Sequence, residues 1–206
     1  MIAVIDYGVG NLFSLVSSLR AVGAEAEVTS DPAVIRSAEK LILPGVGAFA
    51  DAAAKLRQSG LHELIREEAA GGKELLGICL GMQLLFEKSE EYGEHEGLGL
   101  LHGRVVPMEG VIPPALKIPQ IGWNQLHFVR QHRLLRYIRE NDCVYFVHSY
   151  YAADCADSLV ATTEYGAELT AMVARDNVMG CQFHPEKSGN VGLRILRAFC
   201  ESEGKR

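Results

Sequence analysis

Short apolar runs alternate with amphipathic stretches through the first half of the chain, and this alternation constrains the fold more than any other feature. The runs expected to form strands cover residues 2–5, 24–28, 40–43 and 75–78. The stretches expected to form helices cover residues 12–19, 52–57 and 61–70, and another helix is expected to begin at Asp31-Pro32. Strands that alternate with helices build a mostly parallel sheet with helices on both faces. The sequence therefore predicts an open, three-layer α/β fold.

The second half of the chain predicts an antiparallel β extension of that sheet. Its expected strands are closely spaced and cover residues 100–106, 124–129, 143–150, 159–164, 171–174 and 179–183. Asp176-Asn177 has the composition of a hairpin turn between the last two strands, and a closing helix is expected over residues 191–200. Because the chain has 206 residues and no internal repeat, we expect a single domain over residues 1–206.

Composition and net charge argue against several classes of function and location. The net charge of −6 disfavours nucleic acid as a partner. No apolar run approaches the length of a membrane span, and the opening run is too short for a signal peptide. The five cysteines match neither a C-x-x-C nor a zinc pattern, which indicates reduced thiols. We therefore expect a cytoplasmic protein that binds neither nucleic acid nor membrane.

Cofactor and metal motifs are incomplete or missing. Gly8-Val9-Gly10 begins a dinucleotide pattern, but Phe13 occupies the place of the third glycine. Neither a phosphate-binding G-x-x-x-x-G-K motif nor an H-E-x-x-H zinc motif is present in the sequence. We expect no cofactor and no metal.

The segment Gly77-Ile78-Cys79-Leu80-Gly81 has the pattern of a nucleophile on a strained turn. An expected strand precedes Cys79, and a helix is expected over residues 82–88, which is the context in which G-x-S-x-G exposes a serine. Glycines relieve crowding in such a turn and tolerate unusual backbone angles. The N-terminus of the helix would favour the thiolate. The alternative is that Cys79 is buried as a small hydrophobe.

Two further segments offer the groups that acyl chemistry needs. Residues 43–49 follow the third expected strand, and backbone N–H groups of their glycines could face a reacting carbonyl, with the N–H of Leu80 as a second donor. An ordinary turn explains this loop equally well. His184 follows the last expected strand and can act as a base, because Glu186 is close enough to orient its ring.

The other histidines are weaker candidates. His148 lies in an apolar run and is expected in the core. The remaining ones are expected on the surface or in turns: His62, His95, His102, His127 and His132. The acidic run over residues 87–96 is either a solvated helix end or a holder of a cationic substrate group.

Residues 77–83, 44–47 and 184–186 together resemble the class I (triad) glutamine amidotransferases, which have a flavodoxin-like fold. The resemblance covers nearly the whole chain and keeps the order cysteine, histidine, glutamate. A narrower resemblance is to the branch of the family that supplies ammonia to the cyclase subunit of imidazole glycerol phosphate synthase in histidine biosynthesis. It is carried by residues 6–11, 44–49, 121–124, 146–150 and 184–188.

The resemblance implies one amidotransferase type-1 domain that hydrolyses glutamine to glutamate and ammonia and forms a heterodimer with a (β/α)8-barrel cyclase. It implies Cys79 as nucleophile, His184 as proton shuttle and Glu186 as the group that orients His184. The implied oxyanion hole is formed by Gly45, Val46, Gly47 and Leu80. The implied glutamine-binding residues are Gly47, Gln83, Glu91, Ser149 and Tyr150. The implied cyclase-facing residues are Asn11, Trp123, Asn124, Tyr145 and Lys187, although Trp123 suits a core position equally well.

Three alternatives share parts of this pattern. A triad glutaminase that serves another synthase would have the same Cys79, His184 and Glu186, but residues 6–11 argue against it. A cysteine hydrolase or peptidase of similar fold would not release ammonia from free glutamine. A catalytically silent α/β scaffold subunit would not need the three residues together.

Overall fold

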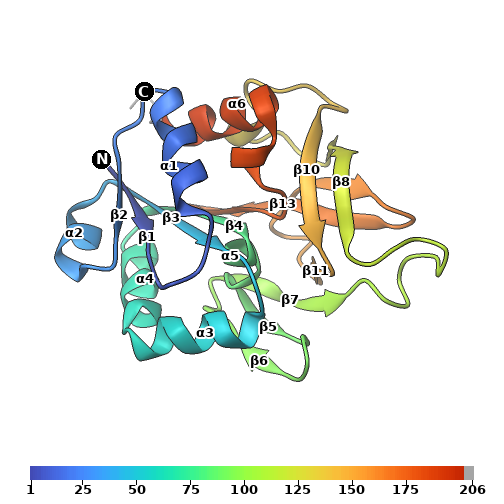
Figure 1. Ribbon diagram of the computed structural model, residues 1–206, viewed down its shortest axis with the longest axis horizontal. Coiled ribbons are helices and arrows are strands. Elements are labelled where there is room, and N and C mark those ends of the chain that lie inside the picture. Colours follow the sequence, from blue (N-terminus) through green and yellow to red (C-terminus); the bar gives the residue numbers. More distant parts are fainter. Residues whose placement is uncertain (202–206) are drawn as a thin grey trace.

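The centre of the computed structural model, which describes residues 1–201, is an eight-stranded sheet (Figure 1). The strands run in the order β2-β1-β3-β4-β14-β13-β12-β9. The parallel strands are β1 (Ile2–Ile5), β2 (Ala26–Thr29), β3 (Lys40–Gly45), β4 (Glu74–Cys79) and β14 (Val178–Cys181). The antiparallel extension comprises β13 (Glu168–Arg175), β12 (Leu159–Glu164) and β9 (His127–Phe128). The predicted open, mostly parallel sheet is confirmed.

Helices cover both faces of this sheet. The helices are α1 (Leu12–Ala21), α2 (Pro32–Ser37), α3 (Phe49–Gln58), α4 (Leu61–Ala70) and α6 (Gly189–Cys200). Figure 1 shows α1 and α6 on one face and α3 and α4 on the other. Along β1, Ile2 and Val4 belong to the hydrophobic core under α1 and α6, whereas Ala3 and Ile5 belong to the core under α3 and α4. A strand buried on both faces needs an unbroken apolar run, which is what the sequence provides.

Two smaller sheets complete the fold. One joins β11 (Tyr150–Ala153), β7 (Leu101–Pro107), β5 (Phe86–Ser89) and β6 (His95–Glu96). The other is an antiparallel ribbon of β8 (Gln120–Gln125) and β10 (Cys143–His148). The short helical turns are α5 (Leu80–Gln83), η1 (Arg133–Leu135) and η2 (Pro185–Lys187). Within residues 1–201, no helix is long and apolar enough to cross a membrane.

The helix expected over residues 82–88 is wrong. α5 ends at Gln83, and Phe86 already begins β5. Leu84, Leu85 and Phe86 are all buried, and consecutive buried residues do not fit a helix with one solvated face. The acidic run over residues 87–96 consequently forms the strand pair β5–β6 and its turn, not a helix end.

Two expected strands are each divided between different sheets. The run over residues 124–129 contributes to β8 and β9, which are separated at Leu126. The run over residues 143–150 contributes to β10 and β11, which are separated at Ser149. The expected hairpin at Asp176-Asn177 is confirmed, because Arg175 pairs with Val178 across it.

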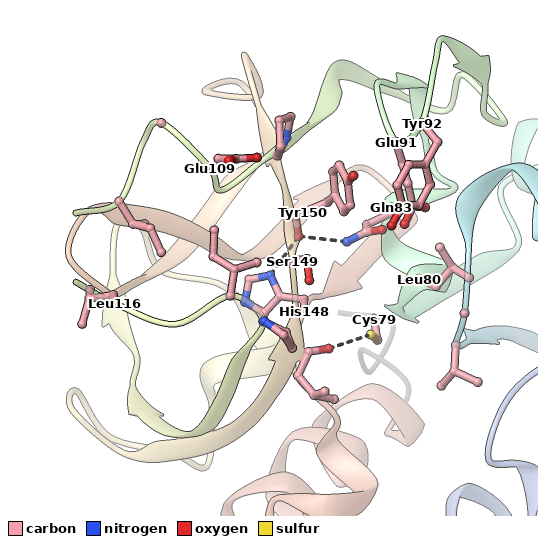
Figure 2. Close-up of a pocket in the computed structure, with 18 of the residues that line it drawn as sticks. Cys79, Leu80, Gln83, Glu91, Tyr92, Glu109, Leu116, His148, Ser149 and Tyr150 are labelled. Carbon is pink, nitrogen blue, oxygen red and sulfur yellow. Dashed lines mark hydrogen bonds between the residues drawn. The ribbon is translucent and has the colours of Figure 1, made fainter. Parts of the chain in front are cut away.

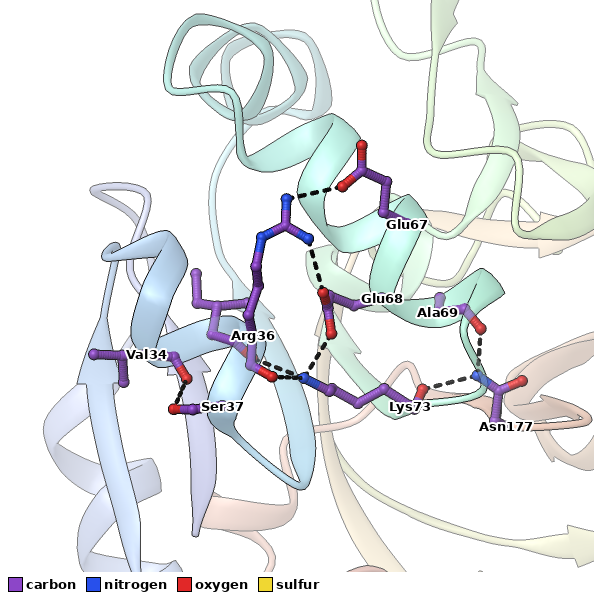
Figure 3. Close-up of polar contacts among 9 residues, drawn as sticks. Val34, Arg36, Ser37, Glu67, Glu68, Ala69, Lys73 and Asn177 are labelled. Atoms are coloured by element: carbon purple, nitrogen blue, oxygen red, sulfur yellow. Dashed lines mark hydrogen bonds and ion pairs between the residues drawn. The ribbon is translucent and has the colours of Figure 1, made fainter.

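A polar cluster joins the elements at the amino-terminal ends of the parallel strands (Figure 3). The carboxylate of Glu68 on α4 forms ion pairs with Arg36 on α2 and with Lys73, which precedes β4. The amide of Asn177 in the β13–β14 turn donates at 2.8 Å to the carbonyls of Ala69 and Lys73. The carbonyl of Ala69, near the end of α4, thereby gains a partner from outside the helix.

The turn after β4 depends on a close approach to β3. Gly45 and Cys79 are opposite each other in the parallel ladder. A Cβ atom at Gly81 would overlap the carbonyl oxygen of Leu43, and one at Gly77 would lie 2.7 Å from the backbone of Met82. The two glycines are therefore required for space; the left-handed backbone angle belongs to Cys79.

Gly81→Ala is expected to lower the free energy of unfolding by about 2–3 kcal/mol, because the backbone of β3 must move to admit the methyl group. Gly71→Ala is the control, since Gly71 has φ −73 and its added Cβ would lie 3.4 Å from two carbonyls. The control is expected to stay within about 1 kcal/mol of the native protein. Urea denaturation at equal m values measures both, and equal stabilities would contradict the role of this contact.

Candidate active site

Three neighbouring parallel strands end at one cavity. β3, β4 and β14 are adjacent in the sheet, and their carboxyl ends lead into the loop over residues 44–47, Cys79 and His184. In open α/β sheets, this edge holds the ligand crevice. The cavity here has a volume of about 1060 Å³ and is lined by Cys79 and His184 among others. Figure 2 shows Cys79 in this cavity, near Ser149 and His148. The predicted glutamine-binding residues all line it: Gly47, Gln83, Glu91, Ser149 and Tyr150.

Cys79 is held in a strained backbone conformation. Its φ of 54° and ψ of −113° lie in a region that residues with a side chain rarely adopt. The side chain is nearly buried but borders the cavity, so Cys79 is not simply a core residue. The sulfur lies 4.0 Å from the carbonyl oxygen of Val147 and 3.8 Å from Nε2 of Gln182. Because α5 has only four residues, few aligned peptide dipoles act on the sulfur.

His184 and Glu186 form a buried pair on the short turn η2. His184 Nδ1 lies 2.8 Å from Glu186 Oε1, and the two side chains are 2% and 4% exposed. His184 Nε2 is buried and makes no hydrogen bond within residues 1–201. Burial lowers the pKa of His184, but Cys79 and Glu186 together raise it more, to about 9. The ring is thus oriented through Nδ1 and keeps Nε2 for proton transfer.

A hydrogen bond from Tyr7 holds the loop after β3 in place. The buried Tyr7 hydroxyl donates to the carbonyl of Pro44 at 2.7 Å, and a Cβ atom at Gly45 would lie 2.7 Å from that hydroxyl. Burial and the nearby Cys79 raise the pKa of Tyr7, so it remains a neutral donor. Beyond Gly45, both Val46 and Gly47 are exposed and line the cavity with Leu80. The predicted oxyanion residues therefore lie beside Cys79.

Two polar side chains of the cavity wall, Glu91 and Gln83, are fixed by backbone partners. Glu91 Oε2 accepts a 2.5 Å hydrogen bond from the backbone N–H of Phe49, the first residue of α3. Gln83 Nε2 donates to the carbonyl of Tyr150 at 3.1 Å and to Oε1 of Gln182 at 3.0 Å. The acidic run thus brings one carboxylate, Glu91, to the cavity wall, which favours the second of its two interpretations.

His148 is a buried histidine with both ring nitrogens in contact with protein, as expected. Nδ1 lies 2.8 Å from the carbonyl of Tyr150 and Nε2 lies 2.9 Å from Gln120 Oε1. Burial lowers the pKa of His148 to about 4, so the ring is neutral at pH 7. His62 was expected on the surface, and that prediction is wrong: it is buried on α4, with Nε2 3.2 Å from the carbonyl of Gly97.

Most predicted partner-facing residues are at least partly exposed. Trp123 on β8 is 55% exposed and lies opposite Tyr145 on β10, with ring centroids 5.9 Å apart, so it is not a core residue. Asn124 is half-buried and donates to the carbonyl of Glu164. Lys187 is exposed at the cavity edge, and the exposed Asn11 caps α1. Tyr145 also links this ribbon to the cavity, because its carbonyl accepts from the backbone N–H of His184.

Three residues that contact the site had no predicted role: Tyr7, Val147 and Gln182. Gln182 could have been found, because it precedes His184 by two residues at a strand end and side chains two apart share a face. Val147 acts through its backbone carbonyl, which leaves no signal in the residue type.

Comparisons with known proteins agree on one family. The model of the family described as Glutamine amidotransferase class-I matches residues 3–202. The chain is 47% identical over 203 residues to the imidazole glycerol phosphate synthase subunit HisH of Wolinella succinogenes, covering 98% of this chain and 99% of that one. It is 50% identical over 201 residues to the HisH subunit of Methanothermobacter thermautotrophicus, covering 98% of each.

Solved structures share the fold at lower identity. A crystal structure of a glutamine amidotransferase superposes with a TM-score of 0.75 at 19% identity and covers 97% of both chains. The structure of PurLQS from Thermotoga maritima gives a TM-score of 0.75 at 21% identity and covers 96% of both chains. These likenesses support the α/β architecture described above.

Glu186→Gln is expected to lower the pKa of His184 from about 9, because the ring loses its carboxylate partner. NMR titration of the His184 ring measures this pKa, with Glu109→Gln at the same cavity as control.

The same pairing predicts a pH dependence of stability. In the native protein, protonated His184 stabilises the fold fully below about pH 6.5 and loses this effect as the pH rises through 9. The variant should lose part of that pH dependence of unfolding, because the contribution of Cys79 remains, and an unchanged His184 titration would contradict the pairing.

Proposed function

This chain belongs to the class-I glutamine amidotransferase family, and on that basis we propose that it is the glutaminase subunit of an imidazole glycerol phosphate synthase in histidine biosynthesis. It hydrolyses glutamine to glutamate and ammonia. A cyclase subunit uses the ammonia to make imidazole glycerol phosphate and aminoimidazole carboxamide ribotide. The observation that carries the proposal is that Cys79 and His184 line one cavity, while Glu186 contacts the far ring nitrogen of His184. The match over residues 3–202 supports a single amidotransferase domain over residues 1–206.

The first half of the reaction forms a thioester. Cys79 and His184 share one proton, which the raised pKa of His184 favours on Nε2, and the sulfur attacks the side-chain amide carbon of glutamine. The amide oxygen becomes an oxyanion, which backbone N–H groups of the loop 45–47 and of Leu80 stabilise. The C–N bond then breaks, and His184 returns the proton to the departing ammonia. Glu186 contacts His184 Nδ1 and stabilises the imidazolium that exists while Nε2 holds the proton.

The second half hydrolyses the thioester. His184 takes a proton from a water molecule, and the resulting hydroxide attacks the thioester carbon. The same backbone donors hold the second oxyanion. The C–S bond breaks, glutamate leaves, and the proton on His184 returns to the Cys79 thiolate. The active site is then restored with no net change in its protons.

Glutamine recognition is assigned to the polar groups of the cavity wall. Glu91 carries a carboxylate that suits the α-ammonium group, and its hydrogen bond to Phe49 fixes its position. Gln83 is oriented by the carbonyl of Tyr150 and leaves its side-chain oxygen for the substrate. Ser149 and Gly47 complete the wall.

The cyclase-facing surface is assigned to Asn11, Trp123, Asn124, Tyr145 and Lys187. The exposed Trp123 ring packed on Tyr145 is the kind of anchor that stable interfaces use. Lys187 directly follows the triad residue Glu186 and is exposed at the cavity edge, so it can report docking to the active site. A cytoplasmic location belongs to the same proposal and is supported by the absence of disulfides among the five cysteines.

Cys79→Ala is expected to lower ammonia release from glutamine by roughly 10³-fold or more, since no other group can form the thioester. The assay measures glutamate and ammonia from the chain in complex with the cyclase. Cys143→Ala removes an exposed cysteine and is expected to keep full activity. Full activity in Cys79→Ala would contradict the mechanism, and hydrolysis of peptides without ammonia release from glutamine would favour a peptidase.

Trp123→Ala is expected to weaken cyclase binding by roughly 30-fold or more, because a central aromatic anchor is lost. Calorimetric titration with the purified cyclase measures the affinity, and Val129→Ala, another exposed apolar residue, is the control.

Lys187→Ala is expected to reduce the stimulation of glutaminase activity by the cyclase and its nucleotide. Native affinity in Trp123→Ala together with native stimulation in Lys187→Ala would refute the assigned surface.

A further inference from the structure

We propose that Gln182 is a catalytic residue that donates a hydrogen bond to the sulfur of Cys79 whenever that sulfur carries negative charge. The proposal rests on the glutaminase function proposed above and adds a group that none of the triad or oxyanion assignments includes. Gln182 is fully buried, directly after β14, and its Nε2 lies 3.8 Å from Cys79 Sγ. Its contact is therefore with the reacting atom itself.

The orientation of the Gln182 amide is dictated by a backbone carbonyl two hydrogen bonds away. The carbonyl of Tyr150 can only accept, so the Gln83 atom 3.1 Å from it must be the nitrogen. That same nitrogen lies 3.0 Å from the Gln182 side chain, so the Gln182 atom facing it must be the oxygen. A flipped Gln182 would place two NH₂ groups against each other. The remaining end of Gln182, a donor, therefore points at the sulfur.

The groups around the sulfur act in opposite directions on its charge. The carbonyl oxygen of Val147, 4.0 Å away, can accept from the thiol but repels the thiolate. Gln182 Nε2 has hydrogens only to donate, so it stabilises the thiolate. Neither group moves a proton; the proton itself passes to His184. Gln182 thus offsets a carbonyl that would otherwise hold Cys79 in its neutral form.

Negative charge reaches the sulfur twice in each reaction cycle. The thiolate first attacks the amide carbon, and in thioester hydrolysis the C–S bond breaks and the electron pair returns to sulfur. A fixed donor at Gln182 favours both events, while the backbone donors of the loop 45–47 act on the oxygen. Because Gln182 also contacts Gln83, the residue that binds glutamine is held in register with the nucleophile.

The test compares matched substitutions at two fully buried glutamines. Gln182→Met removes the donor at the sulfur with little change in length, and Gln182→Glu replaces the N–H by a carboxylate oxygen. Gln120→Met is the control, because Gln120 is equally buried but contacts His148 and not the sulfur. Iodoacetamide alkylation of Cys79 is followed against pH by peptide mass spectrometry in the chain bound to its cyclase. The exposed Cys143 serves as an internal reference.

In Gln182→Met, the alkylation profile of Cys79 is expected to move to higher pH, with about three- to tenfold slower reaction at pH 7, and Gln182→Glu is expected to move it further. kcat should fall by a similar factor with little change in KM. Gln120→Met and Cys143 should keep the native profile. A native Cys79 profile in both Gln182 variants, or an equal shift in Gln120→Met, would overturn the proposal.

The two proposals fail in different ways. If the native complex released no ammonia from glutamine, the glutaminase assignment would fail whatever the alkylation profiles. If the native complex were active but its Cys79 profile did not depend on Gln182, only the role of Gln182 would fail. Should Gln182→Met prove too unstable to purify, the polar Gln182→Glu variant of the same size decides the question.

Discussion

The carbonyl oxygen of Leu43 occupies the space that a side chain at position 81 would need, and the active site depends on this near contact. It allows the turn after β4 to lie against the end of β3, with Gly45 opposite Cys79 in the ladder. The loop that carries the backbone donors and the turn that carries the sulfur are thereby held at a fixed separation. The same turn requires a strained backbone conformation at Cys79, which the surrounding parallel strands maintain.

The chemistry at the sulfur is assembled from separate parts of the fold. Cys79 ends β4, His184 and Gln182 follow β14, and Val147 belongs to the ribbon β8–β10. The ribbon also carries Tyr145, whose carbonyl accepts from the backbone N–H of His184. One ribbon therefore contacts both the nucleophile and the base through main-chain atoms, while its other residues include the exposed Trp123.

Sequence patterns predicted best the elements in which buried residues are continuous or recur at a regular spacing. β1 is apolar throughout because both its faces are covered, and α1 shows apolar residues at helical spacing. The pattern failed over residues 82–88, where Leu84 to Phe86 are buried through contacts with distant strands. Cys79, His184 and Glu186 could be selected because each lies in a short local pattern. The contact of Val147 with the sulfur could not, because it is made by a backbone carbonyl and depends on the approach of a separate strand.

The hydrogen-bond chain from Tyr150 through Gln83 and Gln182 to Cys79 begins at a main-chain oxygen. Every amino acid supplies that oxygen, so a substitution at position 150 leaves the direction of the chain intact. The amides at positions 83 and 182 have no such protection, since Gln83 must donate to two carbonyl oxygens and Gln182 must accept at its oxygen and donate at its nitrogen. A substitution at position 150 is therefore expected to leave both amides oriented as they are, whereas loss of either glutamine interrupts the path from the main chain to the sulfur.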